Sequence, residues 1–80
     1  MKLNDLLTAI KAGKIIVFAY GTHMILAYKK NRKYELKYVY FLPLKIKTFV
    51  ITIRSRDLKD VLWRLMFSGA TIKVKERVRI

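Results

Sequence analysis

The chain has 80 residues, of which 54% are hydrophobic, and its net charge is +13 because 18 lysines and arginines outnumber 5 acidic residues. This length suits one domain and leaves no room for two separate cores, so we treat residues 1–80 as a single basic domain. The absence of cysteine excludes disulfides, a single histidine argues against a zinc site, and the hydrophobic content argues against a disordered basic tail.

The N-terminal segment 3–13 predicts a short helix. Its apolar residues recur at helical spacing and therefore fall on one face; they are Leu3, Leu6, Leu7 and Ile10. Asn4 is the expected N-cap, and Gly13 is expected to end the helix.

Four segments rich in β-branched and aromatic residues follow, and each predicts a strand: 14–20, 22–29, 34–42 and 45–54. The second and third are expected to form a hairpin around Asn31, which tolerates a left-handed conformation. Pro43 is expected to end the third strand.

A hairpin turn centred on Asn31 would make Tyr28 face Tyr34 and Leu26 face Leu36, with Met24 facing Tyr38. That face is apolar and is expected to lie in the core. The other face would be mixed, with the pairs Ala27–Glu35, Ile25–Lys37 and His23–Val39, and with Ile16 and Phe18 of the preceding strand. We therefore expect either one helix on each face or a second subunit, and a homodimer is a hypothesis.

The segment 58–68 predicts the second helix. Its apolar residues follow helical periodicity, Asp57 is the expected N-cap, Asp60 adds negative charge to the first turn, and Gly69 follows the helix. Residues 71–80 predict a last strand. The resulting order αββββαβ indicates an α+β fold, a small and mostly antiparallel sheet of about five strands with two helices.

The last strand carries the most specific functional pattern. Lys73, Lys75, Arg77 and Arg79 alternate with apolar residues, so all four cations are expected to project from one side. Their spacing of ~6.6–6.8 Å would let such a row contact every second phosphate of a nucleic-acid backbone. The alternative is an edge strand kept charged against aggregation.

Two further basic groups are candidates for phosphate contacts. Lys29, Lys30, Arg32 and Lys33 surround the hairpin tip, where the alternative is an ordinary solvated turn. Arg54 and Arg56 precede the second helix, although Asp57 would partly repel an anion there.

Several aromatic residues suggest contacts with bases or partners. Tyr34, Tyr38 and Tyr40 share one strand face and could stack bases, but the expected register places them in the core, which is the better interpretation. Trp63 and Phe67, four residues apart on the second helix, either close the core or form a contact surface.

Catalysis has little support in this sequence. His23 is the only histidine and sits in an apolar strand, where a structural role is expected. No glycine-rich phosphate loop is present, and the paired carboxylates Asp57 and Asp60 are explained by the helix start. We therefore expect no enzyme activity, cofactor, metal or small-molecule substrate.

These patterns together predict a nucleic-acid-binding protein that contacts mainly the phosphate backbone of DNA or RNA. The net charge exceeds the roughly 2–8 that solubility requires, and no helix-turn-helix, zinc finger or basic zipper is seen. One alternative is an interaction or inhibitor protein that docks on an acidic surface of a nucleic-acid-processing complex. Another is a small basic ribonuclease without a histidine dyad.

A membrane location is not expected. The longest stretch without formal charge, 15–28, is too short to span a bilayer, and no apolar signal segment follows Met1. We expect a cytoplasmic protein, and the scarcity of amide side chains is typical of a thermophile.

Overall fold

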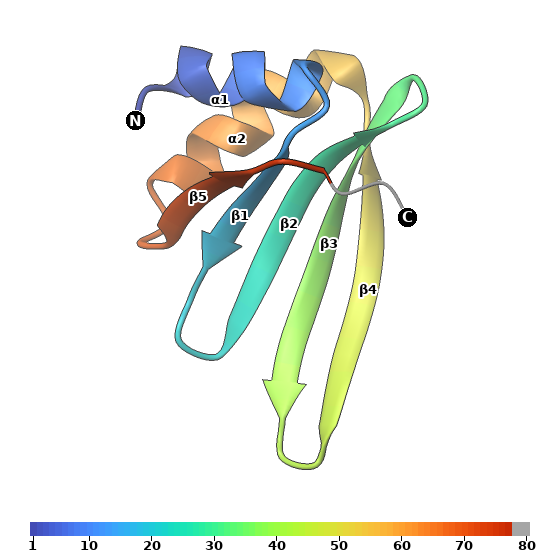
Figure 1. Ribbon diagram of the computed structural model, residues 1–80, viewed down its shortest axis with the longest axis vertical. Helices are drawn as coiled ribbons and strands as arrows, with labels where there is room; N and C mark the ends of the chain where they lie inside the picture. The colour runs from blue at the N-terminus through green and yellow to red at the C-terminus, as the bar shows by residue number, and fades with distance from the viewer. Residues whose placement is uncertain (78–80) are drawn as a thin grey trace.

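The computed structural model describes residues 1–77, which form a five-stranded antiparallel sheet with both helices on one face (Figure 1). The elements are α1 (Leu3–Lys11), β1 (Ile15–Ala19), β2 (His23–Lys30), β3 (Lys33–Leu42), β4 (Lys45–Ile53), the 3-10 turn η1 (Ser55–Asp57), α2 (Leu58–Met66) and β5 (Thr71–Lys75). The strand order is β4-β3-β2-β1-β5, so the last strand pairs with the first. The predicted α+β fold with the order αββββαβ is confirmed.

Helix α1 begins at Leu3, as predicted, but its N-cap lies two residues before the predicted one. Lys2 is the N-cap instead of Asn4, and its main-chain N–H donates to Asp5 Oδ2 at 3.0 Å. A carboxylate at the third helical position can accept this otherwise free N–H, which explains the shift. Gly13 has a φ of 91° and follows the helix, as expected for a residue free of a Cβ clash.

Helix α2 starts at Leu58 with Asp57 as its N-cap, as predicted, although the Asp57 side chain makes no capping hydrogen bond. The preceding η1 turn, Ser55–Asp57, connects β4 to the helix. Gly69 has a φ of 85° and lies in the turn toward β5. The helix ends at Met66, two residues earlier than predicted.

The predicted register of the β2–β3 hairpin is wrong by one residue. The loop consists of Asn31 and Arg32, with Asn31 at a φ of 58°, and Lys30 pairs with Lys33. A turn centred between two residues, instead of on one, shifts every pair by one position, so β2 turns its other face to the core. Tyr28 therefore faces Glu35 instead of Tyr34. Tyr34, Leu36 and Tyr38 of β3 lie on the core side, as predicted.

The orientation of β2 determines which of its residues form the core. Ile25 and Ala27 lie in the core with Ile16 and Phe18, on the face that the sequence suggested would be mixed. The face expected to be buried, with Met24, Leu26 and Tyr28, instead carries no helix.

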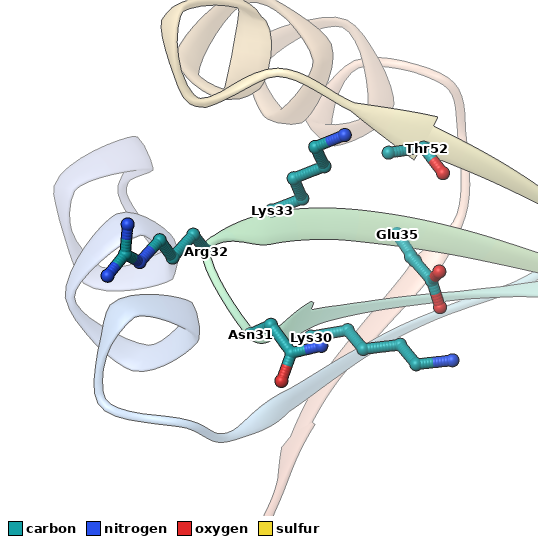
Figure 2. Close-up of a pocket in the computed structure, with 6 residues that line it drawn as sticks. All are labelled: Lys30, Asn31, Arg32, Lys33, Glu35 and Thr52. Carbon is teal, nitrogen blue, oxygen red and sulfur yellow. The ribbon is translucent and has the colours of Figure 1, made fainter.

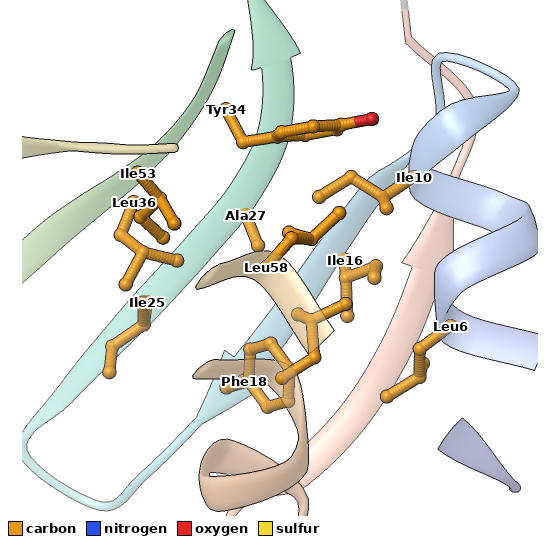
Figure 3. Packing of buried hydrophobic residues seen from close by; sticks show 11 residues of the cluster. Leu6, Ile10, Ile16, Phe18, Ile25, Ala27, Tyr34, Leu36, Ile53 and Leu58 are labelled. Carbon is orange, nitrogen blue, oxygen red and sulfur yellow. The ribbon is translucent and has the colours of Figure 1, made fainter. Parts of the chain in front are cut away.

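Both helices pack on the same sheet face, so the expectation of one helix on each face is also wrong. Figure 3 shows the resulting core, in which α1 and α2 each contribute two leucine or isoleucine side chains. The buried residues are Leu6, Ile10, Ile16, Phe18, Ile25, Ala27, Tyr34, Leu36, Ile53, Leu58 and Leu62.

Strand β5 ends at Lys75 and is shorter than the predicted 71–80. Residues 78–80, including Arg79, lie outside the described part of the chain. No helix within residues 1–77 has the length and apolar character needed to cross a bilayer.

The core assignment predicts that Phe18→Ala lowers the free energy of unfolding by about 3–5 kcal/mol, because Phe18 is 0% exposed and its removal leaves a cavity. The matched control is Phe67→Ala, since Phe67 is 70% exposed and its loss is expected to cost less than about 0.5 kcal/mol. Urea unfolding of both variants measures the difference, and equal effects would contradict the one-sided core.

Candidate nucleic-acid interface

The sheet face without helices, which we call the open face, carries side chains from all five strands. One cross-strand row shows its character: Lys73, Val17, Leu26, Lys37 and Val50 are successive partners from β5 to β4. Directly paired residues project to the same side, so this row places two lysines around apolar neighbours. The open face consists of Ile15, Val17, Ala19, Met24, Leu26, Tyr28, Lys30, Lys33, Glu35, Lys37, Val39, Phe41, Ile46, Thr48, Val50, Thr52, Thr71, Lys73 and Lys75.

The alternating cations of the last strand divide into two parts. Lys73 and Lys75 lie on β5 and are exposed on the open face, as the alternation predicts. Arg77 follows the strand and bends across the same face. Its Nη1 donates to the Lys29 main-chain oxygen at 2.6 Å, and its guanidinium carbon lies 5.5 Å from the Tyr28 ring centroid.

The basic residues of the hairpin tip lie on different sides of the sheet. Figure 2 shows those around the hollow at the tip. Lys30 and Lys33 are direct partners at the end of the open face, and together with Glu35 and Thr52 they line a shallow hollow. Asn31 and Arg32, at the end of the hairpin, also line this hollow. Lys29 pairs with the buried Tyr34 and therefore belongs to the helix side of the sheet.

Lys37 belongs to the open face but was not among the predicted site residues. The one-residue error in register placed it beside Ile25, whereas it pairs with Leu26 and Val50. The alternation of Lys33, Glu35 and Lys37 is visible in the sequence, but it does not show which face lacks helices.

Arg54 and Arg56 do not join the open face. Both are exposed between β4 and α2, and Arg56 lines a hollow with Lys59 and Trp63 on the helical layer. Two of the predicted residues, Lys30 and Lys33, lie on the open face with Arg32 beside them in the same hollow, and Lys73, Lys75 and Arg77 lie on this face as well. Lys37 joins them, whereas Lys29, Arg54 and Arg56 lie apart.

Carboxylates are scarce around these cations. Glu35 is the one acidic residue on the described strands, and its Oε1 accepts a hydrogen bond from the Tyr28 hydroxyl at 2.9 Å. Glu76 lies beyond β5 and forms an ion pair with Lys14 at 3.3 Å. Asp60 pairs with Arg64 on the helical layer at 3.1 Å. The open face is thus left with a strong excess of positive charge.

Lysines in direct opposition raise the energy of the unbound protein. The paired Lys30 and Lys33 place two like charges on facing positions, which is unfavourable. An anion bound between them would relieve the repulsion.

The centre of the open face is apolar. Ile15, Val17, Met24 and Leu26 line a shallow hollow together with Lys75, Glu76 and Arg77. A ligand on this face would therefore contact cations at the periphery and aliphatic side chains in the middle.

The tyrosines considered for base stacking lie on the opposite, helix-covered side of the sheet. Tyr34 is buried and Tyr38 packs against the core, which confirms core packing for both. Tyr40 is half-buried and stacks with His23, at 4.9 Å between ring centroids.

These rings belong to a row that we call the aromatic ladder: Tyr20, His23, Tyr40, Phe49 and Tyr38. Three of its centroid distances, 4.5, 4.9 and 4.7 Å, are close to the spacing of neighbouring strands. The fourth, 5.8 Å, joins Tyr40 and Phe49, which are diagonal neighbours in the register. His23 and Tyr40 each have a neighbouring ring on both of their faces, so neither offers a free face to a base. The ladder thus accounts for His23 and Tyr40 without a bound nucleotide.

Trp63 and Phe67 do not close the core. Their rings contact each other at 4.9 Å on the outer side of α2, and both are exposed. Core closure is therefore wrong for both residues, and a contact surface stays a prediction.

Within the described residues no cluster of three or more histidine, cysteine, aspartate or glutamate side chains could hold a metal ion. No protein-family model, curated protein or solved structure matches this chain. The functional argument therefore depends on the geometry of the open face.

The contact between Tyr28 and Glu35 predicts that the Tyr28 hydroxyl ionises at a higher pH than a free tyrosine. Partial burial raises the pKa of Tyr28 above its ordinary value, and the hydrogen bond to Glu35 raises it further; burial also raises the pKa of Tyr38. In an ultraviolet titration Tyr28 and Tyr38 should ionise above the ordinary tyrosine pKa, and Tyr28→Phe should reduce this late change in absorbance.

The folded state favours the neutral Tyr28 hydroxyl, so the free energy of unfolding falls when the pH is high enough to ionise it. This contribution is fully present below about pH 10, the unfolded tyrosine pKa, and is lost as the pH rises through the higher folded value. Glu35→Gln should lower the pKa of Tyr28 only partly, because burial is the larger cause. A Tyr28→Phe protein with an unchanged titration curve would contradict the assignment.

Proposed function

We propose that the protein binds nucleic acid through the open face, mainly by contacts to the phosphate backbone, and that it acts by binding and not by catalysis. The observation that carries the proposal is the collection of cations on the helix-free face of the sheet: Lys30, Lys33, Lys37, Lys73, Lys75 and Arg77. Two carboxylates lie near these cations among the described residues, and both are engaged: Glu35 by the Tyr28 hydroxyl and Glu76 by Lys14.

The spacing of the cations suits an extended polyanion. Lys73 and Lys75 lie ~6.7 Å apart along β5, since two residues of strand separate them. Lys73 and Lys37 occupy the same row three strand spacings apart, or ~14 Å. Cations at these separations can contact phosphates along one strand and across a groove.

Arg77 supports the same proposal by a different contact. Because its guanidinium is anchored on the Lys29 carbonyl and rests over Tyr28, the position of this charge is defined before a ligand arrives. A preformed charge loses less conformational freedom on binding than a free side chain does.

A second candidate function is an interaction protein that binds an acidic protein surface. The apolar centre of the open face, with Ile15, Val17 and Leu26, favours it because aliphatic side chains suit a protein partner. A pull-down separates the two functions, since a protein partner that persists after nuclease treatment supports the second.

The proposal predicts salt-dependent binding to at least one member of a panel of single- and double-stranded DNA and RNA. With four to six phosphate contacts on a duplex, log K should fall against log salt with a slope of about −4 to −5. Gel shifts at several salt concentrations measure the slope. No binding at low salt, or binding indifferent to salt, would refute the proposal.

A pair of matched double variants locates the interface. The double variant Lys73→Gln, Lys75→Gln loses two phosphate contacts. Its slope of log K against log salt on a duplex should therefore be smaller in magnitude by about 1.8. Lys11→Gln with Lys59→Gln removes the same charge from exposed positions on the helices and should leave the slope nearly unchanged. Equal effects of the two pairs would mean that binding follows net charge and not the open face.

A further inference from the structure

Strand β4 forms one edge of the sheet and is paired on one side only. It runs over nine residues, Lys45–Ile53, and its neighbour in the sheet is β3 (Figure 1). The outer side of such a strand presents main-chain N–H and C=O groups that another strand can bind.

The two edges of the sheet differ in their protection. The opposite edge, β5, has five residues and projects Lys73 and Lys75, which are features that discourage pairing. On β4 the lysines are confined to the start of the strand, at positions 45 and 47, and the segment 48–53 contains neither charge nor proline. β4 is therefore the edge that is free to pair.

β4 is also apolar on both of its faces. Ile46 and Val50 are 65% and 49% exposed on the open-face side, and Phe49 and Ile51 are each 44% exposed on the helix side. Exposed apolar side chains on both sides of an unprotected edge are typical of a strand that pairs with another strand.

The aromatic ladder reaches this edge at Phe49. Its ring stacks inward on Tyr38 and Tyr40, at 4.7 and 5.8 Å, and no strand within residues 1–77 pairs with the outer side of β4. A ring supplied by a further strand at this position would continue the stack across the edge.

We propose that β4 pairs antiparallel with β4 of a second copy of this chain, about a twofold axis at Phe49, to give a continuous ten-stranded sheet. The second copy is favoured as the occupant because this pairing sets Phe49 against Phe49 of the other copy. Facing residues have Cβ atoms ~4.5–5.5 Å apart, which is the separation that stacking of the two rings needs.

The charges of β4 agree with this register. Centred on Phe49, the two strands overlap over all nine residues, and Thr48 faces Val50, Lys47 faces Ile51 and Lys45 faces Ile53. No lysine faces a lysine, whereas registers centred on residues 45–47 would place like charges opposite each other.

The pairing supplies enough contacts for a specific interface. Nine paired residues give roughly nine main-chain hydrogen bonds, which lies within the range of about 10 ± 5 for protein interfaces. The opposing term is repulsion between two chains of charge +13 each, which salt screens over ~10 Å at 0.1 M.

Symmetry also determines where the open faces lie. Because facing residues of paired strands project to the same side, the helices of both copies lie on one side and both open faces on the other. The dimer would therefore carry one basic surface of twice the width. The dimer itself requires no nucleic acid, so it goes beyond the proposed function.

Solution mass tests the dimer without any ligand. At high micromolar concentration and moderate salt, sedimentation equilibrium should give the mass of two chains, and added salt should strengthen the dimer while it weakens nucleic-acid binding. Val50→Lys should give the mass of one chain with an unchanged circular dichroism spectrum. The control Phe67→Lys adds the same charge at an exposed helical position and should remain dimeric.

Disulfide trapping tests the register. The chain has no cysteine, so single variants are unambiguous. A mixture of Thr48→Cys and Val50→Cys proteins, one of them labelled with 15N, should form mainly mixed disulfides under mild oxidation. Positions 48 and 50 of different copies face each other, whereas identical positions lie diagonally at ~7–8 Å, beyond easy disulfide geometry.

Three outcomes would overturn the proposal: a one-chain mass for the unaltered protein under all these conditions, a dimer that Val50→Lys does not affect, or mixed disulfides no more abundant than like ones. Each of these results leaves binding to nucleic acid and the Lys73 and Lys75 comparison untouched, so failure of the dimer and failure of the proposed function are distinguishable.

Discussion

The one-sided packing of two short helices on the sheet is the contact on which the rest of the structure depends. Leu6 and Ile10 of α1 and Leu58 and Leu62 of α2 cover the face that carries Ile16 and Phe18. A one-residue slip in any strand would turn its buried side chains toward water, so this packing also determines the register of the sheet. Eighty residues supply no second helical layer, and the other face is left open.

The helices are also much shorter than the strands they cover. Nine helical residues span ~13.5 Å, whereas the ten residues of β3 span ~34 Å. The β3–β4 hairpin consequently extends beyond the helices (Figure 1). On the helix side of this extension the aromatic ladder provides the packing that a longer helix would otherwise provide, with Tyr20 anchored by a hydrogen bond to Ser68 at the end of α2.

One-sided packing separates the charges of the molecule as well. Three of the acidic residues, Asp5, Asp57 and Asp60, lie in the first turns of helices, where the positive end of the helix dipole favours them. The open face retains Glu35 and a larger number of lysines. The two proposals use different parts of the same sheet, because the open face offers positive charge to a polyanion and the β4 edge offers main-chain groups to a second copy.

The helices and strands could be predicted from the residue pattern alone, because they arise from local periodicity. The order αββββαβ, the N-cap at Asp57 and the shared orientation of Lys73 and Lys75 were all predictable, since they depend on residues close together in the chain. The alternation of cations in a strand needs no knowledge of its neighbours.

Long-range packing determines which face of the sheet Lys73 and Lys75 occupy and which residues surround them. The register of β2 against β3 depends on whether the turn is centred on Asn31 or beside it, and the sheet resolves this by burying Ile25 and Ala27. Lys37 joins the open face for the same reason. Arg77 reaches the Lys29 carbonyl across 48 positions of sequence, and the aromatic ladder joins residues from several strands. Such contacts join residues that are far apart in the sequence, so local residue patterns do not predict them.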